Sequence, residues 1–143
     1  EEKFAVVAKE VIEHGKQVWL FGSASDKIIT DRIHKMLPRG YEKECANLAG
    51  RTTLLDAVDL INLCGHVVTN DSGLMHVAAA VGCKIVVLYG STSPEFTPPL
   101  TSDATVVRRS IVCSPCFKRD CPLEHKDCLN LIQPRDVLIQ LGL

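Results

Sequence analysis

Short apolar runs alternate with helical patterns along the whole chain. The clearest run is 84–89 (KIVVLY), and other runs lie at 17–21, 47–49, 66–69 and 104–108. Between these runs, apolar residues recur with the three-to-four-residue spacing of amphipathic helices. Neighbouring parallel strands need a long connection, usually a helix, so this order predicts βαβ crossovers. The sequence therefore predicts an α/β fold with a parallel sheet and helices on both of its faces.

The expected helices are bounded by residues that commonly start or end a helix. Asp26 and Thr53 are expected N-caps, and Gly15, Gly65 and Gly82 are expected stops. The resulting helices span about 4–15, 26–37, 53–64, 72–81 and 134–141. The third helix is expected to bury an apolar face made of Leu54, Leu55, Val58, Ile61 and Leu63. Two segments are expected to be loops, 90–101 and about 110–130.

Length and composition are those of one globular domain, 1–143. The chain has 143 residues, is 46% hydrophobic and has a net charge of −1. A net charge so close to zero produces no overall positive electrostatic potential that would attract nucleic acid or an anionic membrane. The chain contains no run of about 20 apolar residues, the length that a helix needs to span a bilayer. Because the chain begins at Glu1 rather than at a methionine, we expect it to be a piece of a longer protein.

Polar and glycine-rich loops follow three of the expected strands. They are 22–26 (GSASD), 70–73 (NDSG) and 90–93 (GSTS). In open α/β sheets, ligands bind beyond the carboxyl ends of the strands. These three loops are therefore the expected ligand-binding region.

The segment 69–80 (TNDSGLMHVAAA) carries the strongest of these signals. Its helix is expected to begin at Ser72, where unpaired N–H groups and a partial positive charge favour an anion. Gly73 allows close approach to the backbone, and His76 lies on the same helix face as Ser72. These features predict a phosphate or diphosphate site. Asp71 would repel such an anion, so it is expected to face a sugar hydroxyl.

Simpler explanations exist for the same residues. Asp71 or Ser72 could be an ordinary helix cap, and His76 could be a packed histidine on a buried helix. A dinucleotide-binding enzyme is not favoured, because the chain has no G-x-G-x-x-G fingerprint, and it has no Walker motif.

Four of the seven cysteines are clustered, at Cys113, Cys116, Cys121 and Cys128. Thiolates at this spacing can hold a structural zinc. The alternative is a small satellite core of reduced cysteines. An odd cysteine total and no visible secretory signal favour a reducing, cytoplasmic compartment. Basic residues surround the cluster and are expected to form a solvated loop; they are Arg108, Arg109, Lys118, Arg119 and Lys126.

Two motifs together resemble a known family. NDSGLMHVAAAVG, followed by a strand and YGSTSPEFTPPL, is similar to the bacterial ADP-heptose:lipopolysaccharide heptosyltransferases, glycosyltransferase family 9. NLAGRTTLLDAVDLI and VWLFGSASD resemble other parts of the same family, so the likeness covers most of the chain. It implies the C-terminal half of a GT-B glycosyltransferase, a Rossmann-like domain that holds the nucleotide-sugar donor.

The resemblance also implies residue roles. Ser72, Gly73 and His76 would contact the donor diphosphate, and Asp71 the heptose. Ser23 and Asp26 would lie near the ribose, and Arg51 and Thr52 near the adenine; these four roles come from the resemblance alone.

The reaction that the resemblance implies is an inverting, metal-independent transfer of heptose to the lipopolysaccharide inner core. The catalytic base and the acceptor surface would belong to an N-terminal domain that this sequence does not contain. No catalytic residue is therefore assigned, and the isolated chain is expected to bind ADP-heptose without transferring it.

The expected location is the cytoplasm, at the inner membrane, with no nucleic-acid partner. Two alternatives remain, a donor domain for another sugar nucleotide such as a UDP-sugar, and a zinc-binding nucleic-acid module.

Overall fold

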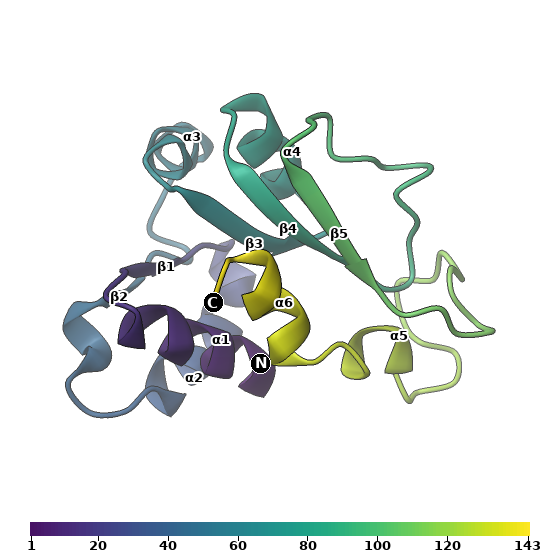
Figure 1. Cartoon of the computed structure of the whole chain (residues 1–143), viewed down its shortest axis with the longest axis horizontal. Coiled ribbons are helices and arrows are strands. Elements are labelled where there is room, and N and C mark those ends of the chain that lie inside the picture. Colours follow the sequence, from purple (N-terminus) through teal and green to yellow (C-terminus); the bar gives the residue numbers. More distant parts are fainter. The chain divides into compact units, whose positions relative to one another are not determined.

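The strands of the computed structural model form two separate parallel sheets (Figure 1). The structure describes residues 1–143. The chain divides into two compact units, 1–57 with 142–143, and 58–141. The parallel α/β class predicted from the sequence is confirmed, with the strands distributed over two sheets.

The first unit contains two strands and two main helices. In chain order, its elements are α1 (Glu2–Glu13), β1 (Val18–Leu20), the 3₁₀ turn η1 (Ala24–Asp26), α2 (Lys27–Met36), the 3₁₀ turn η2 (Tyr41–Lys43) and β2 (Cys45–Asn47). β1 and β2 pair in parallel, with Val18 opposite Cys45 and Leu20 opposite Asn47. The β1 residues are only half-buried, although their apolar run would suit a fully buried strand.

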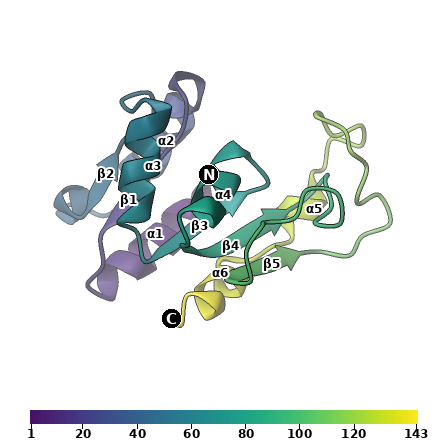
Figure 2. The same ribbon diagram turned by 90° about the horizontal axis from the view of Figure 1, so that it is seen from above.

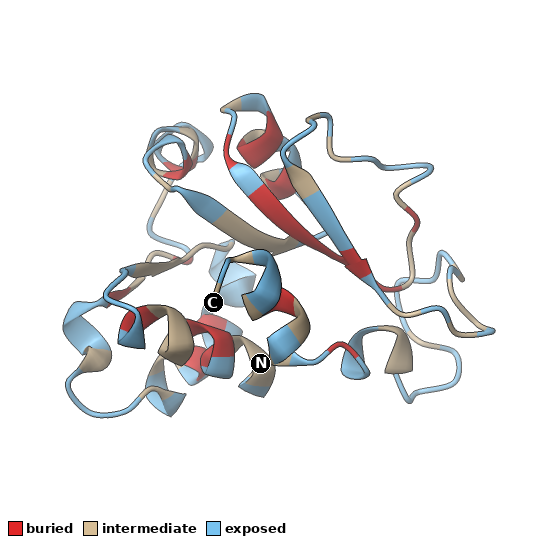
Figure 3. Ribbon diagram, viewed as in Figure 1, coloured by how far each residue is buried: buried red, intermediate tan, exposed pale blue.

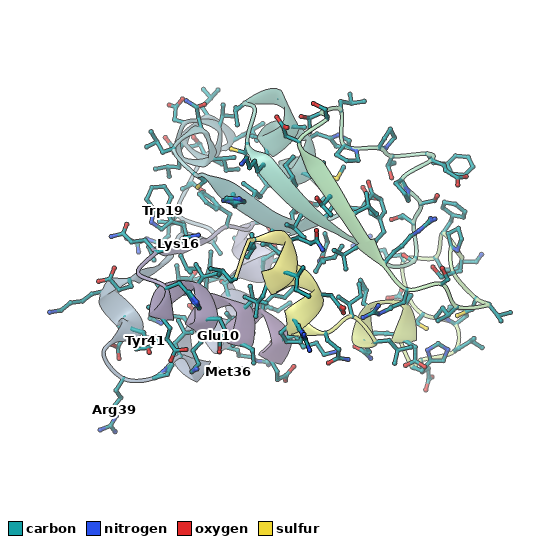
Figure 4. All side chains as sticks on the ribbon, in the orientation of Figure 1. Glu10, Lys16, Trp19, Met36, Arg39 and Tyr41 are labelled. Carbon is teal, nitrogen blue, oxygen red and sulfur yellow. The ribbon has the colours of Figure 1, made fainter.

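α1 supplies much of the apolar core of this unit. Ala5, Val7, Ala8 and Ile12 are buried, at the spacing of one helix face. The opposite face is charged, and Lys9 Nζ lies 2.8 Å from Glu13 Oε2. Tyr41 reaches the end of α1, where its hydroxyl donates to Glu13, while Arg39 extends away from the chain (Figure 4).

α3 (Leu54–Asn62) begins in the first unit and ends in the second. Thr53 caps it as predicted, since the Asp56 N–H donates to Thr53 Oγ1 and the Thr53 N–H donates to Asp56 Oδ2. The predicted apolar face is partly wrong. Leu54 and Leu55 are 67% and 76% exposed, and the buried α3 side chains are Ala57 and Ile61. Leu63 is 72% exposed as well, while Val58 is half-buried and Ile61 is buried as predicted, so the error lies in the leucines near the two ends of the helix.

The second unit is built on a three-stranded parallel sheet in the order β3-β4-β5. Its elements are β3 (His66–Asn70), α4 (Gly73–Ala80), β4 (Lys84–Tyr89), β5 (Ala104–Arg108), α5 (Asp127–Asn130) and α6 (Pro134–Gln140). The views in Figures 1 and 2 place α4 and α6 on opposite faces of this sheet. Helices therefore cover both faces, as the sequence predicts.

The central strand β4 and the helix α4 form the core of the second unit (Figure 3). Every β4 residue from Ile85 to Tyr89 is buried, as expected for a strand with a neighbour on each side and a helix on each face. On α4, Met75, Ala78 and Ala79 are buried. The small alanines allow close packing of the helix on the strands.

None of the helices in the structure is long and apolar enough to cross a membrane.

Candidate functional site

Two of the three predicted loops lie together at one edge of the three-stranded sheet. Asn70, the last residue of β3, pairs with Leu88, the penultimate residue of β4. Because the two strands are parallel, the segments 71–73 and 90–93 leave the sheet at the same edge. The third loop, 22–26, follows β1 in the first unit.

The entrance to α4 has donors that the chain does not use. Ser72 is the N-cap residue, with extended backbone, but its side chain caps no helix N–H group. Its Oγ lies 3.3 Å from Thr69 Oγ1 instead. The backbone N–H groups of Gly73 and Leu74 have no acceptor within the chain. The simple capping explanation of Ser72 is therefore wrong, and the entrance presents free donors to solvent.

His76 lies one turn into α4 and is exposed. The alternative of a packed histidine is therefore wrong. Its imidazole and the free first-turn amides belong to the same end of the helix, where the helix dipole is positive. This end can bind an anion through backbone donors, a hydroxyl and an imidazole at once.

Asp71 is held by a residue far away in the sequence. Thr97 Oγ1 donates to Asp71 Oδ2 over 2.8 Å. The backbone carbonyl of Thr97 in turn accepts a hydrogen bond from the hydroxyl of Tyr89, which is buried at the end of β4. Asp71 is thus no helix cap: its carboxylate is oriented by the 90–101 segment.

The 90–93 loop is built into the structure more firmly than the sequence suggested. Ser93 is 4% exposed, and its Oγ accepts the N–H of Glu95, so this hydroxyl is not available to a ligand. The Gly90 carbonyl accepts from Ser114 Oγ (2.7 Å) and the Ser91 carbonyl from the Phe117 N–H (2.7 Å). The cysteine-rich segment therefore packs against this loop, which no local sequence signal indicated.

In the first unit, the structure brings together the four residues expected near the nucleoside. The Ser23 N–H and Oγ both donate to Asp26 Oδ2, over 2.8 and 2.6 Å. Asp26 therefore closes the η1 turn, and the prediction that its side chain caps α2 is wrong. The Gly50 N–H donates to the Gly22 carbonyl, which places Arg51 and Thr52 beside this turn. Gly50 has φ +69°, and a Cβ there would lie 3.0 Å from the Ala24 backbone, so only glycine fits this close approach.

The Ser23–Asp26 contact predicts a pH-dependent stability. The Ser23 hydroxyl and N–H lower the pKa of Asp26 below its ordinary value. A lowered carboxyl pKa contributes stability at neutral pH that is lost as the pH falls through that pKa. Ser23→Ala should therefore lower the thermal midpoint at pH 7 by a few degrees at most, since the pair is exposed. The difference from the parent should shrink below about pH 3.

Ser25→Ala is the matched control, because Ser25 Oγ contacts Ser23 Oγ but not the carboxylate. Equal midpoint losses for Ser23→Ala at pH 7 and pH 2.5 would contradict the assignment.

All four clustered cysteines are half-buried free thiols. Burial raises the pKa of the Cys128 thiol, and the neighbouring sulfurs of Cys116, Cys113 and Cys121 raise it further. Cys113 Sγ lies 4.0 Å from His125 Nε2. No three His, Cys, Asp or Glu side chains are arranged to hold a metal ion. Structural zinc stays a prediction, which equimolar zinc in the purified chain would establish and seven metal-free thiols would reject.

One of the basic residues near the cluster has an internal role. Arg109 forms an ion pair with Asp136 at the start of α6, and its Nε donates to the Leu131 carbonyl. It joins the end of β5 to the C-terminal helices. Arg108, Lys118, Arg119 and Lys126 are exposed, as expected for a solvated loop.

The sequence is similar to that of known glycosyltransferases. Residues 1–127 match glycosyltransferase family 9 (heptosyltransferase). The chain is 51% identical over 105 residues to lipooligosaccharide heptosyltransferase 2 of Haemophilus influenzae, an alignment that covers 73% of this chain and 30% of the relative. It is 45% identical over 139 residues to lipopolysaccharide heptosyltransferase 2 of Escherichia coli, covering 97% of this chain and 40% of the relative.

Solved structures have the same fold. The structure of E. coli ADP-heptose lipopolysaccharide heptosyltransferase II matches with a TM-score of 0.86 at 43% identity, over 98% of this chain and 39% of that one. A glycosyltransferase family 9 protein from Veillonella parvula matches with a TM-score of 0.82 at 25% identity, over 99% of this chain and 40% of that one. This chain therefore spans between 30% and 40% of the length of these relatives. The family match and these identities show that the chain belongs to glycosyltransferase family 9, the heptosyltransferases.

Proposed function

We propose that the chain is the donor-binding, C-terminal half of a GT-B heptosyltransferase and that it holds ADP-heptose. The observation that carries the proposal is the entrance to α4, where the backbone N–H groups of Gly73 and Leu74 have no acceptor in the fold. The Ser72 hydroxyl, whose one partner is Thr69 Oγ1, and the exposed His76 belong to the same end of the helix. Family membership supports a sugar nucleotide as the anion. The relatives named heptosyltransferase 2, the branch of the family that the motifs resemble, support ADP-heptose.

The same entrance suggests how the chain assists the reaction. When the bond between heptose and ADP breaks, negative charge grows on the β-phosphate. Donors fixed at that position stabilise the developing charge more than the ground state, which lowers the barrier. The free amides of α4 and His76 are such donors, so the transfer needs no metal ion or other cofactor to neutralise the leaving group.

The remaining donor contacts are part of the proposal. Asp71 binds a heptose hydroxyl, Ser23 and Asp26 lie near the ribose, and Arg51 and Thr52 near the adenine. Asp26 Oδ2 is occupied by Ser23, which leaves Oδ1 without a partner in the chain as the acceptor for a ribose hydroxyl.

The acceptor and the catalytic base lie outside this chain in the proposed enzyme. The acceptor is the lipopolysaccharide inner core, held by an N-terminal domain, and the proposed location is the cytoplasmic face of the inner membrane. The 143-residue chain alone should therefore bind the donor and transfer no heptose. Heptose transfer by the chain alone would contradict this division of roles.

Calorimetric titration with ADP, UDP and ADP-heptose tests the proposal. ADP and ADP-heptose should bind and UDP should bind more weakly. Equal binding of UDP would favour another sugar nucleotide, and salt-sensitive binding of RNA without ADP binding would favour the nucleic-acid module. Asp71→Ala should weaken ADP-heptose by about ten- to a hundredfold, the loss of one hydrogen bond to a charged group, and leave ADP within about twofold. An equal loss for both ligands would contradict the sugar-binding role of Asp71.

A further inference from the structure

We propose that Thr97 is a positioning residue for the donor sugar: through its side-chain hydroxyl it fixes the carboxylate of Asp71 in the orientation that accepts a heptose hydroxyl. The inference rests on the proposed function and adds a residue that neither loop motif singles out. Thr97 lies 26 residues after Asp71 in the sequence, on the loop that follows the neighbouring strand.

The Thr97 hydroxyl has two possible acceptors. Asp71 Oδ2 lies 2.8 Å from Thr97 Oγ1, and the Ser93 carbonyl oxygen lies 3.3 Å from it. The carboxylate is both nearer and charged, so it takes the proton. This bond occupies Oδ2 and leaves Oδ1 without a donor in the chain. One oxygen of Asp71 is thereby anchored while the other remains free for a sugar hydroxyl.

The backbone of Thr97 is fixed independently of this hydroxyl. Its N–H donates to the Ser93 carbonyl over 3.2 Å, and its carbonyl accepts the hydroxyl of Tyr89. Tyr89 is 1% exposed and so provides a rigid support. Burial raises the pKa of Tyr89 and the Asp71 carboxylate raises it further, so the phenol stays protonated and remains a donor.

A second contact supports the loop next to Thr97. The rings of Phe96 and Phe117 meet edge to face, with centroids 5.3 Å apart, which links the loop to the cysteine-rich segment. Neither this contact nor the two backbone hydrogen bonds of Thr97 requires the hydroxyl. Removing the hydroxyl should therefore leave the loop in place and release only the carboxylate of Asp71.

Orientation of this carboxylate matters for the sugar and not for the diphosphate. A preoriented acceptor does not lose its own rotational freedom when the ligand binds. ADP has no heptose and gains nothing from Asp71. Loss of the Thr97 hydroxyl should consequently act on the sugar-specific part of the affinity alone, which a general structural defect would not do.

The experiment measures the dissociation constants of ADP and ADP-heptose for the 143-residue chain and its variants. Thr97→Val keeps the β-branched shape and removes the donor; it should weaken ADP-heptose by about five- to tenfold and leave ADP within about twofold. Thr97→Ser keeps the hydroxyl and should restore most of the affinity. Thr101→Val is the matched control, since Thr101 Oγ1 accepts only the Asp103 N–H and lies outside this network.

A double substitution separates the possible outcomes. In an Asp71→Ala background, Thr97→Val should have no further effect, because its partner is already absent. If Asp71→Ala weakens ADP-heptose and Thr97→Val does not, the positioning role is wrong and the proposed function stands. If Thr97→Val weakens ADP and ADP-heptose equally, its effect is structural and the inference is also wrong. If the parent chain binds neither ligand, the proposed function fails as well.

Discussion

A Gly73→Ala chain is expected to be as stable as the parent, or slightly more stable, and to bind ADP about ten- to a hundredfold more weakly. The expected loss corresponds to one displaced hydrogen bond between a backbone N–H and a phosphate, worth roughly 1.5–3 kcal/mol. The reason for opposite effects on stability and on binding lies in the surroundings of Gly73.

Nothing within the fold requires a glycine at this position. Gly73 is the first residue of α4 and does not have a positive φ. A Cβ built on it would meet no atom of the chain within 4 Å. Glycine in a helix is less favourable than alanine by up to about 1 kcal/mol. The glycine is therefore best explained by something outside the fold that must approach the backbone closely, which here is the donor diphosphate.

The measurements are a thermal melt and an ADP titration of the same protein preparation. Gly65→Ala is the matched control, because Gly65 also lacks a positive φ and a Cβ there would also meet no atom within 4 Å. Gly65 precedes β3 at the end of the strand away from the ligand, so its substitution should not affect ADP binding. Unchanged ADP affinity in Gly73→Ala would place the diphosphate somewhere other than the α4 entrance.

The parts of the fold that the sequence predicts well are those with strong local signals. The strands at 84–89 and 104–108 are confirmed to the residue, because each contains a run of apolar or β-branched residues with a charged residue at only one end. α4 is confirmed between Ser72 and Gly82, where the positive φ of +80° at Gly82 explains the stop. The sequence analysis does not predict α5, because its four residues are too few to show helical periodicity. They also lie at the end of the cysteine-rich segment that is expected to be a loop.

The residues of the candidate site also fall into those that the sequence predicts and those that it does not. The entrance to α4 is visible in the sequence, because Ser72, Gly73 and His76 lie within five consecutive positions of one helix. The support for Asp71 is not visible, since Thr97 becomes its neighbour only when β3 and β4 pair. Contacts between loops that follow adjacent strands depend on sheet register, which local spacing does not specify.

The largest effect on stability is expected from Tyr89→Ala, about 3–5 kcal/mol of the free energy of unfolding. The Tyr89 side chain is 1% exposed, lies at the end of the central strand and contacts Met75 of α4, with 3.6 Å between its hydroxyl oxygen and the sulfur. Truncation would leave a cavity between β4 and α4 and remove the donor to the Thr97 carbonyl.

Tyr89→Phe separates these two contributions. It keeps the ring and removes only the hydroxyl, and Thr97 is exposed enough for water to replace the lost donor, so the expected cost is about 1 kcal/mol. Urea unfolding followed by far-ultraviolet circular dichroism measures both variants. Similar losses for the two would mean that the hydroxyl, and not the packing of the ring, provides most of the stabilisation. A much larger loss of unfolding free energy for Tyr89→Ala than for Tyr89→Phe would mean that packing of the ring stabilises both α4 and the 90–101 loop. The fold of the second unit and the orientation of Asp71 would then depend on the same side chain.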